Sequence, residues 1–242
     1  FIRHDSSVAV EVGGKPFTTF YFGATAPKPY LHPLLTAEGL RLTRQYPMQD
    51  VKDETQDHPH HRGLWVTHGD VNGIDFWASE PEQRKGKQGL VVLKKMLEMT
   101  DGASSGTLRV LLEWQSPSGK PMVTEDRTMT FAGDAQRRTI DFDIALSVPA
   151  KAVFGDTKEG YFAIRLRDEI TEEKGSGRMV NAEGKSGMDQ VWGKRSAWVD
   201  YAGTVEGKKV GIAIFDHPSN PHYPTWWHAR AYGLFAANPF GE

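Results

Sequence analysis

Histidines are concentrated in one short segment of this 242-residue chain. Four of the nine lie between Glu54 and Asp70: His58, His60, His61 and His68. Histidine is the side chain best suited to proton transfer near neutral pH, and it is also the commonest metal ligand. Charged neighbours in the same segment could orient the imidazoles or shift their pKa values. The segment is therefore predicted to form the centre of a functional site.

Two kinds of chemistry fit this cluster. The first is acid–base catalysis on a small polar substrate, in which His58, His60, His61 and His68 move protons and Arg62 stabilises developing charge. The second is a metal site in which iron, copper or zinc is held by His58, His60 and His61. The pair His58 and His60 has the His-x-His spacing that begins the cupin metal motif, but Leu64 and Trp65 stand where that motif requires a glutamate. The sequence therefore requires no cofactor, although a divalent metal in another arrangement stays open.

A second concentration of chemistry-bearing residues lies near the C-terminus. If residues 226–235 form a strand, Trp226, His228, Arg230 and Tyr232 share one face, because side chains alternate along a strand. Flat aromatic rings beside hydrogen-bond donors suit a sugar, since rings stack on C–H faces and donors bind hydroxyls. This face is predicted to supply His228 and Arg230 to catalysis and Trp226 and Tyr232 to substrate binding.

Further candidates lie between these two regions. Glu159 precedes a predicted strand and is a candidate acid, base or ligand. Asn72-Gly73 is a strong signal for a tight turn, and Asp75 and Trp77 are expected to emerge from it on the same side, near the histidines. Together with Trp65 they are predicted to bind substrate. For Trp192, packing in the core is the favoured interpretation.

Composition and missing motifs exclude several classes of function. The formal net charge is −2 and no basic run occurs, so nothing favours nucleic acid or an anionic membrane as partner. The chain has no cysteine, which excludes disulfides, thiolate metal sites and a cysteine nucleophile. No stretch of 18 apolar residues is present to span a membrane. Walker A, GxGxxG, GxSxG and HExxH motifs are absent, which argues against nucleotide, NAD, serine-hydrolase and zincin chemistry.

The apolar runs are short, alternate with polar residues and end at Gly, Pro, Asp or Asn, which is typical of strands. Eleven strands are predicted: Ser7–Val12, Phe17–Phe22, Leu64–His68, Leu90–Met99, Thr107–Gln115, Met122–Phe131, Arg137–Leu146, Tyr161–Arg167, Ala197–Tyr201, Val210–Phe215 and Trp227–Ala236. We expect an all-β fold, a large antiparallel β-sandwich, in a single domain over residues 1–242. The segment Glu172–Gly187 is predicted to be a long exposed loop.

Several motifs resemble those of one bacterial family. They are Lys28-Pro-Tyr-Leu-His-Pro33, Asp57-His-Pro-His-His-Arg-Gly-Leu-Trp65, His68-Gly-Asp-Val-Asn-Gly73, Asp156-Thr-Lys-Glu-Gly160, Trp192-Gly-Lys-Arg195, Trp227-His-Ala-Arg-Ala-Tyr-Gly233 and Asn238-Pro-Phe-Gly241. The chain is similar to the soluble family labelled "methane oxygenase PmoA-like". The monooxygenase subunit behind that label is a membrane protein, so the resemblance does not imply methane oxidation.

The resemblance implies a family of unknown function that is often exported and is frequent in bacteria rich in carbohydrate-degrading genes. We therefore expect a periplasmic or secreted protein involved in carbohydrate metabolism, and a galactose-mutarotase-like supersandwich is one architecture that fits. Members of the family continue beyond the Asn-Pro-Phe-Gly motif, so we also expect C-terminal strands that this sequence does not include.

The preferred hypothesis is an enzyme that acts on a sugar or glycan, as a small molecule or an oligosaccharide. In it an imidazole protonates a ring or glycosidic oxygen, while Glu159 or another histidine withdraws a proton. Epimerase, lyase and hydrolase chemistry would all use these groups. The alternatives are a metal-dependent oxygenase or hydrolase with histidine ligands, and a carbohydrate-binding module without catalysis.

Overall fold

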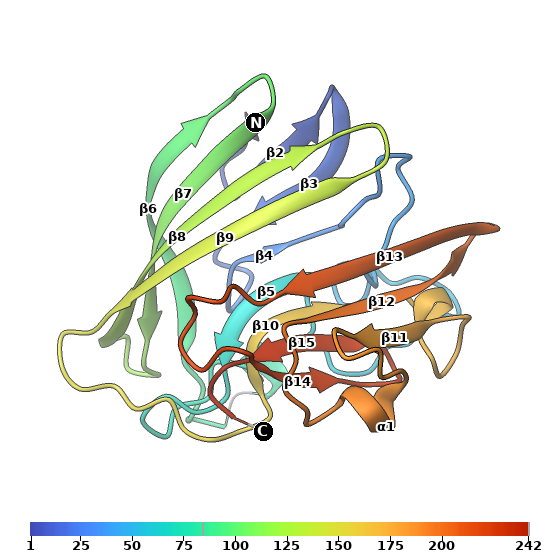
Figure 1. Cartoon of the computed structure of the whole chain (residues 1–242). Helices are drawn as coiled ribbons and strands as arrows, with labels where there is room; N and C mark the ends of the chain where they lie inside the picture. Colours follow the sequence, from blue (N-terminus) through green and yellow to red (C-terminus); the bar gives the residue numbers. More distant parts are fainter. Residues whose placement is uncertain (84, 242) are drawn as a thin grey trace.

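The structure, a computed structural model, describes residues 1–83 and 85–241 and is almost entirely β. The named strands form three antiparallel sheets (Figure 1). The eight-stranded sheet runs, in spatial order, through β1 (Ile2–Arg3), β2 (Ser7–Val12), β3 (Lys15–Tyr21), β4 (Tyr30–Leu31), β5 (Leu64–His68), β10 (Gly160–Arg165), β15 (Leu234–Asn238) and β14 (Trp226–Ala229). The four-stranded sheet contains β6 (Leu90–Thr100), β7 (Ser105–Gln115), β8 (Pro121–Gly133) and β9 (Arg138–Ser147). The three-stranded sheet contains β11 (Arg178–Asn181), β12 (Trp198–Val205) and β13 (Lys208–Phe215).

Both smaller sheets pack against the large one and share a single apolar core with it. The Phe142 ring of β9 meets Phe162 of β10 with ring centroids 4.8 Å apart. The Tyr201 ring of β12 meets Phe235 of β15 at 6.0 Å. These contacts between sheets bear out the predicted antiparallel sandwich. In Figure 1 the four-stranded sheet fills the upper left and the three-stranded sheet the lower right.

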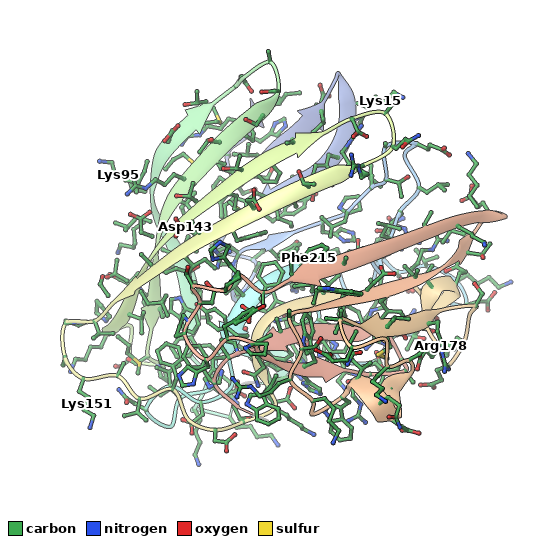
Figure 2. The ribbon with its side chains drawn as sticks, in the orientation of Figure 1. Lys15, Lys95, Asp143, Lys151, Arg178 and Phe215 are labelled. Carbon is green, nitrogen blue, oxygen red and sulfur yellow. The ribbon has the colours of Figure 1, made fainter. Side chains whose placement is uncertain are left out.

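The alternating pattern of β9 shows how the sequence specifies this arrangement. Ile140, Phe142, Ile144 and Leu146 are partly buried, whereas Asp141, Asp143 and Ala145, which alternate with them, are exposed. Asp143, labelled in Figure 2, lies on the exposed side of this strand. Because burial of apolar area is the main stabilising contribution, this period-two pattern fixes which face of the strand points inward.

Strand β5 differs because it is buried on both faces. Leu64 belongs to the main core, whereas Trp65 belongs to a second, smaller apolar cluster that includes Tyr30, Trp77 and Leu234. Adjacent residues of a strand point to opposite faces. The second cluster therefore lies on the face of the large sheet that does not form the main core, and the histidine-rich loop packs over it.

Two predicted elements are wrong. The predicted strand Trp227–Ala236 is a hairpin in which β14 and β15 are joined by a turn at residues 230–233. Gly233 has a φ of +93°, and its N–H donates to the Arg230 carbonyl to close the turn. The predicted loop Glu172–Gly187 contains β11, where Met179 and Asn181 are buried. This segment is mostly polar, so its sequence does not indicate the strand that pairs with β12.

In residues 1–83 and 85–241 helical structure is confined to three short segments. They are α1 (Met188–Val191) and two single turns of 3₁₀ helix at Pro81–Gln83 and Asp168–Ile170. None of the helical segments in the described part of the chain has the length and apolar character that a membrane-spanning helix needs.

Candidate active site

A cavity of about 470 Å³ opens over the second apolar cluster. Four segments that are distant in sequence meet there: the loop before β5, the loop after β5, the residues before β10, and the end of β14 with its turn. The lining residues are His58, His60, His61, Gly69, Asp75, Trp77, Ala78, Lys158, Glu159, His228, Arg230 and Tyr232. The structure thus brings together most of the residues that the sequence singles out, from all three predicted regions.

A column of parallel rings forms one wall of the cavity. The His58 ring stacks between Tyr232, at a centroid distance of 5.2 Å, and His61, at 4.7 Å. The His61 ring in turn stacks on Trp65 at 5.1 Å. Offset stacking of this kind holds each ring in one plane. Trp65 is buried at the inner end of this stack. It therefore supports the rings of His61 and His58 and does not line the cavity.

Buried arginines anchor the loop that carries these histidines. Asp57 accepts hydrogen bonds from Arg44 and from Arg165 Nη2, the latter at 2.7 Å, and both arginine side chains are fully buried. The Asp57 Oδ2 atom also lies 2.9 Å from His58 Nδ1, in a geometry too bent for an ideal hydrogen bond. Burial opposes ionisation of Asp57, but His58, Arg165 and Arg44 outweigh it and hold the pKa of this carboxyl well below its usual value. Asp57 is thus a fixed negative charge beside His58.

The remaining cavity histidines are kept neutral. Burial, with smaller contributions from Lys28 and His58, lowers the pKa of His60 to about 3. Burial and the positive charge of Arg230 lower the pKa of His228 to about 4. The pKa of His61 is also lowered well below its usual value by burial and by its neighbours. At neutral pH these imidazoles accept hydrogen bonds, and they are poor proton donors.

Glu159 is shifted in the opposite sense. Burial raises the pKa of its carboxyl, and Lys158 beside it only partly offsets this effect. Gly69 places the chain close to this residue, because its N–H donates to the Glu159 carbonyl at 2.6 Å. A Cβ atom at position 69 would lie 2.7 Å from the Glu159 Cβ, so glycine is required for this approach. Glu159 is therefore held in place and kept more readily protonated than an exposed glutamate.

The turn after β5 forms as expected from Asn72-Gly73. Both residues have positive φ values, of +54° and +79°. Asp75 Oδ1 accepts the backbone N–H groups of Trp77 and Ala78, at 2.7 and 3.1 Å, and so folds the chain back over the cavity. This local hydrogen bonding brings Asp75 and Trp77 to the same wall, as predicted.

Four predicted site residues do not line the cavity. His68 lies on the opposite face of β5 from Trp65, where its ring contacts Phe154 and Phe240 and its Nε2 lies 2.8 Å from the Gly155 carbonyl oxygen. Arg62 makes a two-pronged ion pair with the buried Glu80.

Trp65 is the third, stacked under the His61 ring and outside the cavity. Trp226 shares a strand face with His228, but it packs under the Arg195 guanidinium, away from the cavity. The alternation of β5 explains why His68 is excluded, since the parity of its position turns it toward the main core.

Sequence reasoning missed two residues near the cavity and misassigned a third. Lys158 lines it, with Nζ 3.9 Å from Glu159 Oε1. Lys28 is fully buried, and its Nζ donates to the carbonyl of Trp77, a cavity residue, at 2.6 Å. Trp192 was expected in the core but is 38% exposed and lies against Arg230. Lys28 and Trp192 both stand within the ordered motifs of the sequence, which was the available signal for them.

The side chains that line the cavity are not arranged as a metal site. In residues 1–83 and 85–241, no group of three or more His, Asp or Glu side chains is arranged to hold an ion. The His58 and His61 rings are parallel to within 10°, so their in-plane lone pairs do not converge on one point. A site formed by His58, His60 and His61 would need these rings to leave their stack.

The chain was compared with known proteins through family models. Residues 7–242 match the model described as "Family of unknown function (DUF6807)". The chain belongs to this family. Its description agrees with the unknown function that the resemblance implied, and it carries no PmoA-like label. No curated protein and no solved structure matches this DUF6807 chain.

The buried neutral histidines make a prediction about acid stability. In the DUF6807 chain, burial lowers the pKa values of His32 and His228 to about 4 and that of His60 to about 3. In the unfolded chain these groups titrate near pH 6.5. As the pH falls from 6.5 toward 4, these histidines bind protons in the unfolded state but stay neutral in the native state. Stability is therefore lost over this window, by up to about 1.4 kcal/mol per histidine and pH unit.

Urea unfolding at pH 7, 6 and 5 measures this loss. His60→Gln is expected to reduce the slope of stability against pH, and His4→Gln, at an exposed position, is expected to leave it unchanged. Equal stability at pH 7 and pH 5 would show that these histidines are not buried in the neutral form.

Proposed function

We propose that this DUF6807 protein acts on a sugar or glycan by acid–base chemistry in the cavity lined by His58, Glu159, His228 and Tyr232. The observation that carries the proposal is a set of buried polar atoms without a hydrogen-bond partner on residues that line this cavity. Besides His58 Nδ1, which lies beside Asp57, they are Trp77 Nε1, His228 Nδ1 and Arg230 Nε. Buried polar groups are almost always hydrogen-bonded in native proteins. A polyhydroxylated ligand supplies donors and acceptors to all three.

The aromatic walls support the same ligand class. Trp77 and the stacked pair of Tyr232 and His58 offer flat apolar faces beside the polar atoms. Sugars present C–H faces and hydroxyl edges, and this mixture of rings and convergent polar groups suits both. A cavity of about 470 Å³ has room for one or two sugar residues.

The surroundings of Glu159 and His58 support a division of roles. Glu159 has a raised pKa and so is the candidate general acid, which protonates a glycosidic, ring or carbonyl oxygen. His58 is the candidate base, because Asp57 lies 2.9 Å from its Nδ1 and stabilises the imidazolium that forms on proton uptake. The sequence alone favoured an imidazole as acid, with Glu159 or another histidine as base.

A panel of neutral and acidic monosaccharides and short oligosaccharides tests the proposal. Thermal shift identifies the ligands, and proton NMR of each mixture follows loss of the sugar or a change at its anomeric centre. We expect at least one sugar to raise the melting temperature and to be converted. Binding without conversion would point to a carbohydrate-binding module, and no binding across the panel would contradict the proposal.

A further inference from the structure

Arg230 stands out among the cavity residues because its charge lies between two rings. Its guanidinium carbon is 4.2 Å from the Trp192 ring centroid and 5.7 Å from that of Tyr232. Stacking of this kind attracts the cation and restricts its rotation. The hydrogen-bonding edge of the group is thus held in one plane at the cavity wall.

Among the residues that the structure describes, the side chain of Arg230 has no counter-ion. Within residues 1–83 and 85–241 it makes no hydrogen bond and no ion pair, and its Nε is buried without a partner. The fully buried arginines, in contrast, each have a carboxylate partner. Arg44 and Arg165 share Asp57, and Arg127 pairs with Glu125. Arginine stays charged under all ordinary conditions, so a half-buried guanidinium favours an anion beside it.

The carboxylates of the cavity do not fill this role. Asp75 uses Oδ1 to accept the N–H groups of Trp77 and Ala78. Glu159 feels the charge of Arg230, but its ion pair is with Lys158, at 3.9 Å. The Arg230 end of the cavity thus keeps an uncompensated positive charge.

Resting on the proposed function, we infer that Arg230 receives an anionic substituent of the sugar, so that the natural substrate is an acidic sugar. The planar fork of a guanidinium matches a carboxylate in two-pronged geometry, and it also binds sulfate or phosphate oxygens. The stacked rings fix the orientation of this fork. His228 Nδ1 and Trp77 Nε1 are available to bind the hydroxyl groups of the same sugar.

Matched sugars separate this inference from the proposed function. Isothermal titration compares glucose with glucuronic acid and glucose 6-sulfate, and galactose with galacturonic acid. For the wild-type protein, we expect an acidic member to bind about 10- to 100-fold more tightly than its neutral partner, as for a charged hydrogen bond. A preference for the uronic acid identifies a carboxylate as the anion, and a preference for glucose 6-sulfate identifies a tetrahedral anion.

Three variants complete the test. Arg230→Gln is expected to remove the preference for the acidic sugar, so that the acidic and neutral members of a pair bind with similar affinity. Arg230→Lys keeps the charge without the fork and is expected to retain only part of the preference. Arg3→Gln, at an exposed position on β1, is expected to behave like the wild type. Equal affinity for neutral and acidic sugars, or a preference that survives Arg230→Gln, overturns the inference and leaves the proposed function standing. A wild-type protein that binds no sugar of either kind overturns both.

Discussion

Replacing Glu159 by glutamine is expected to lower turnover of a converted sugar by about 10²–10⁴-fold, the usual contribution of a general acid. Glutamine keeps the size of the side chain and its hydrogen-bonding capacity, but it carries no transferable proton. Binding of the sugar is therefore expected to change little. Steady-state kinetics followed by NMR or a coupled assay gives kcat and KM separately.

The pH dependence distinguishes this role from a structural one. Because burial raises the pKa of Glu159, the protonated form persists to higher pH than for an exposed glutamate. Wild-type turnover is expected to fall on the alkaline side as this group ionises, and the residual turnover of Glu159→Gln is expected to lack that limb. Glu98→Gln, at an exposed position on β6, serves as the control. An unchanged kcat in Glu159→Gln would show that another group supplies the proton.

Asp57→Asn is expected to destabilise the protein strongly and also to impair the site. The substitution leaves two fully buried guanidinium groups, those of Arg44 and Arg165, without their shared counter-charge. Breaking a buried ion pair from one side typically costs about 3–5 kcal/mol. We expect about 3 kcal/mol here, at the lower end, because the Asp57 side chain is 34% exposed and water screens part of the effect. Urea unfolding at pH 7 measures the loss.

A matched ion pair on the surface supplies the control. Arg109 donates two hydrogen bonds to Asp126, at 2.8 and 2.7 Å, so this pair also joins arginine to aspartate, but at the surface. Asp126→Asn is expected to cost only about 0–1 kcal/mol, since exposed ion pairs contribute little. Similar losses in the two variants would mean that the network under His58 is not an anchor. A second readout is turnover, which is expected to fall in Asp57→Asn and to stay constant in Asp126→Asn.

Local patterns predicted the sheet elements well wherever turn residues mark both ends of an apolar run. Strands β2 and β5 have the predicted bounds, because apolar runs there end at turn residues. The hairpin at Gly233 was missed because the turn residues 230–233 continue the alternation of large and small side chains that begins at His228 and Ala229. The strand β11 was missed for the opposite reason, since its neighbours are polar and its burial comes from pairing with β12.

The residues of the candidate site were predictable by type, and their positions were less so. Glu159 and His228 stand far apart in the chain, and only the order of the strands β10, β15 and β14 brings them to one cavity. The exclusion of His68 follows from strand parity, which the sequence contains, combined with the side on which the main core lies, which it does not. The contact of Trp192 with Arg230 is tertiary and has no local signal.

The most direct test of the account is a crystal structure of the Glu159→Gln variant with the best-binding sugar of the panel, since a slow variant retains its substrate. We expect the sugar to lie in the cavity, over the rings of Trp77 and Tyr232. Its hydroxyls are expected within hydrogen-bond distance of His228 Nδ1, and a sugar oxygen is expected within reach of residue 159. A sugar bound elsewhere on the protein, with this cavity occupied only by water, would contradict the account.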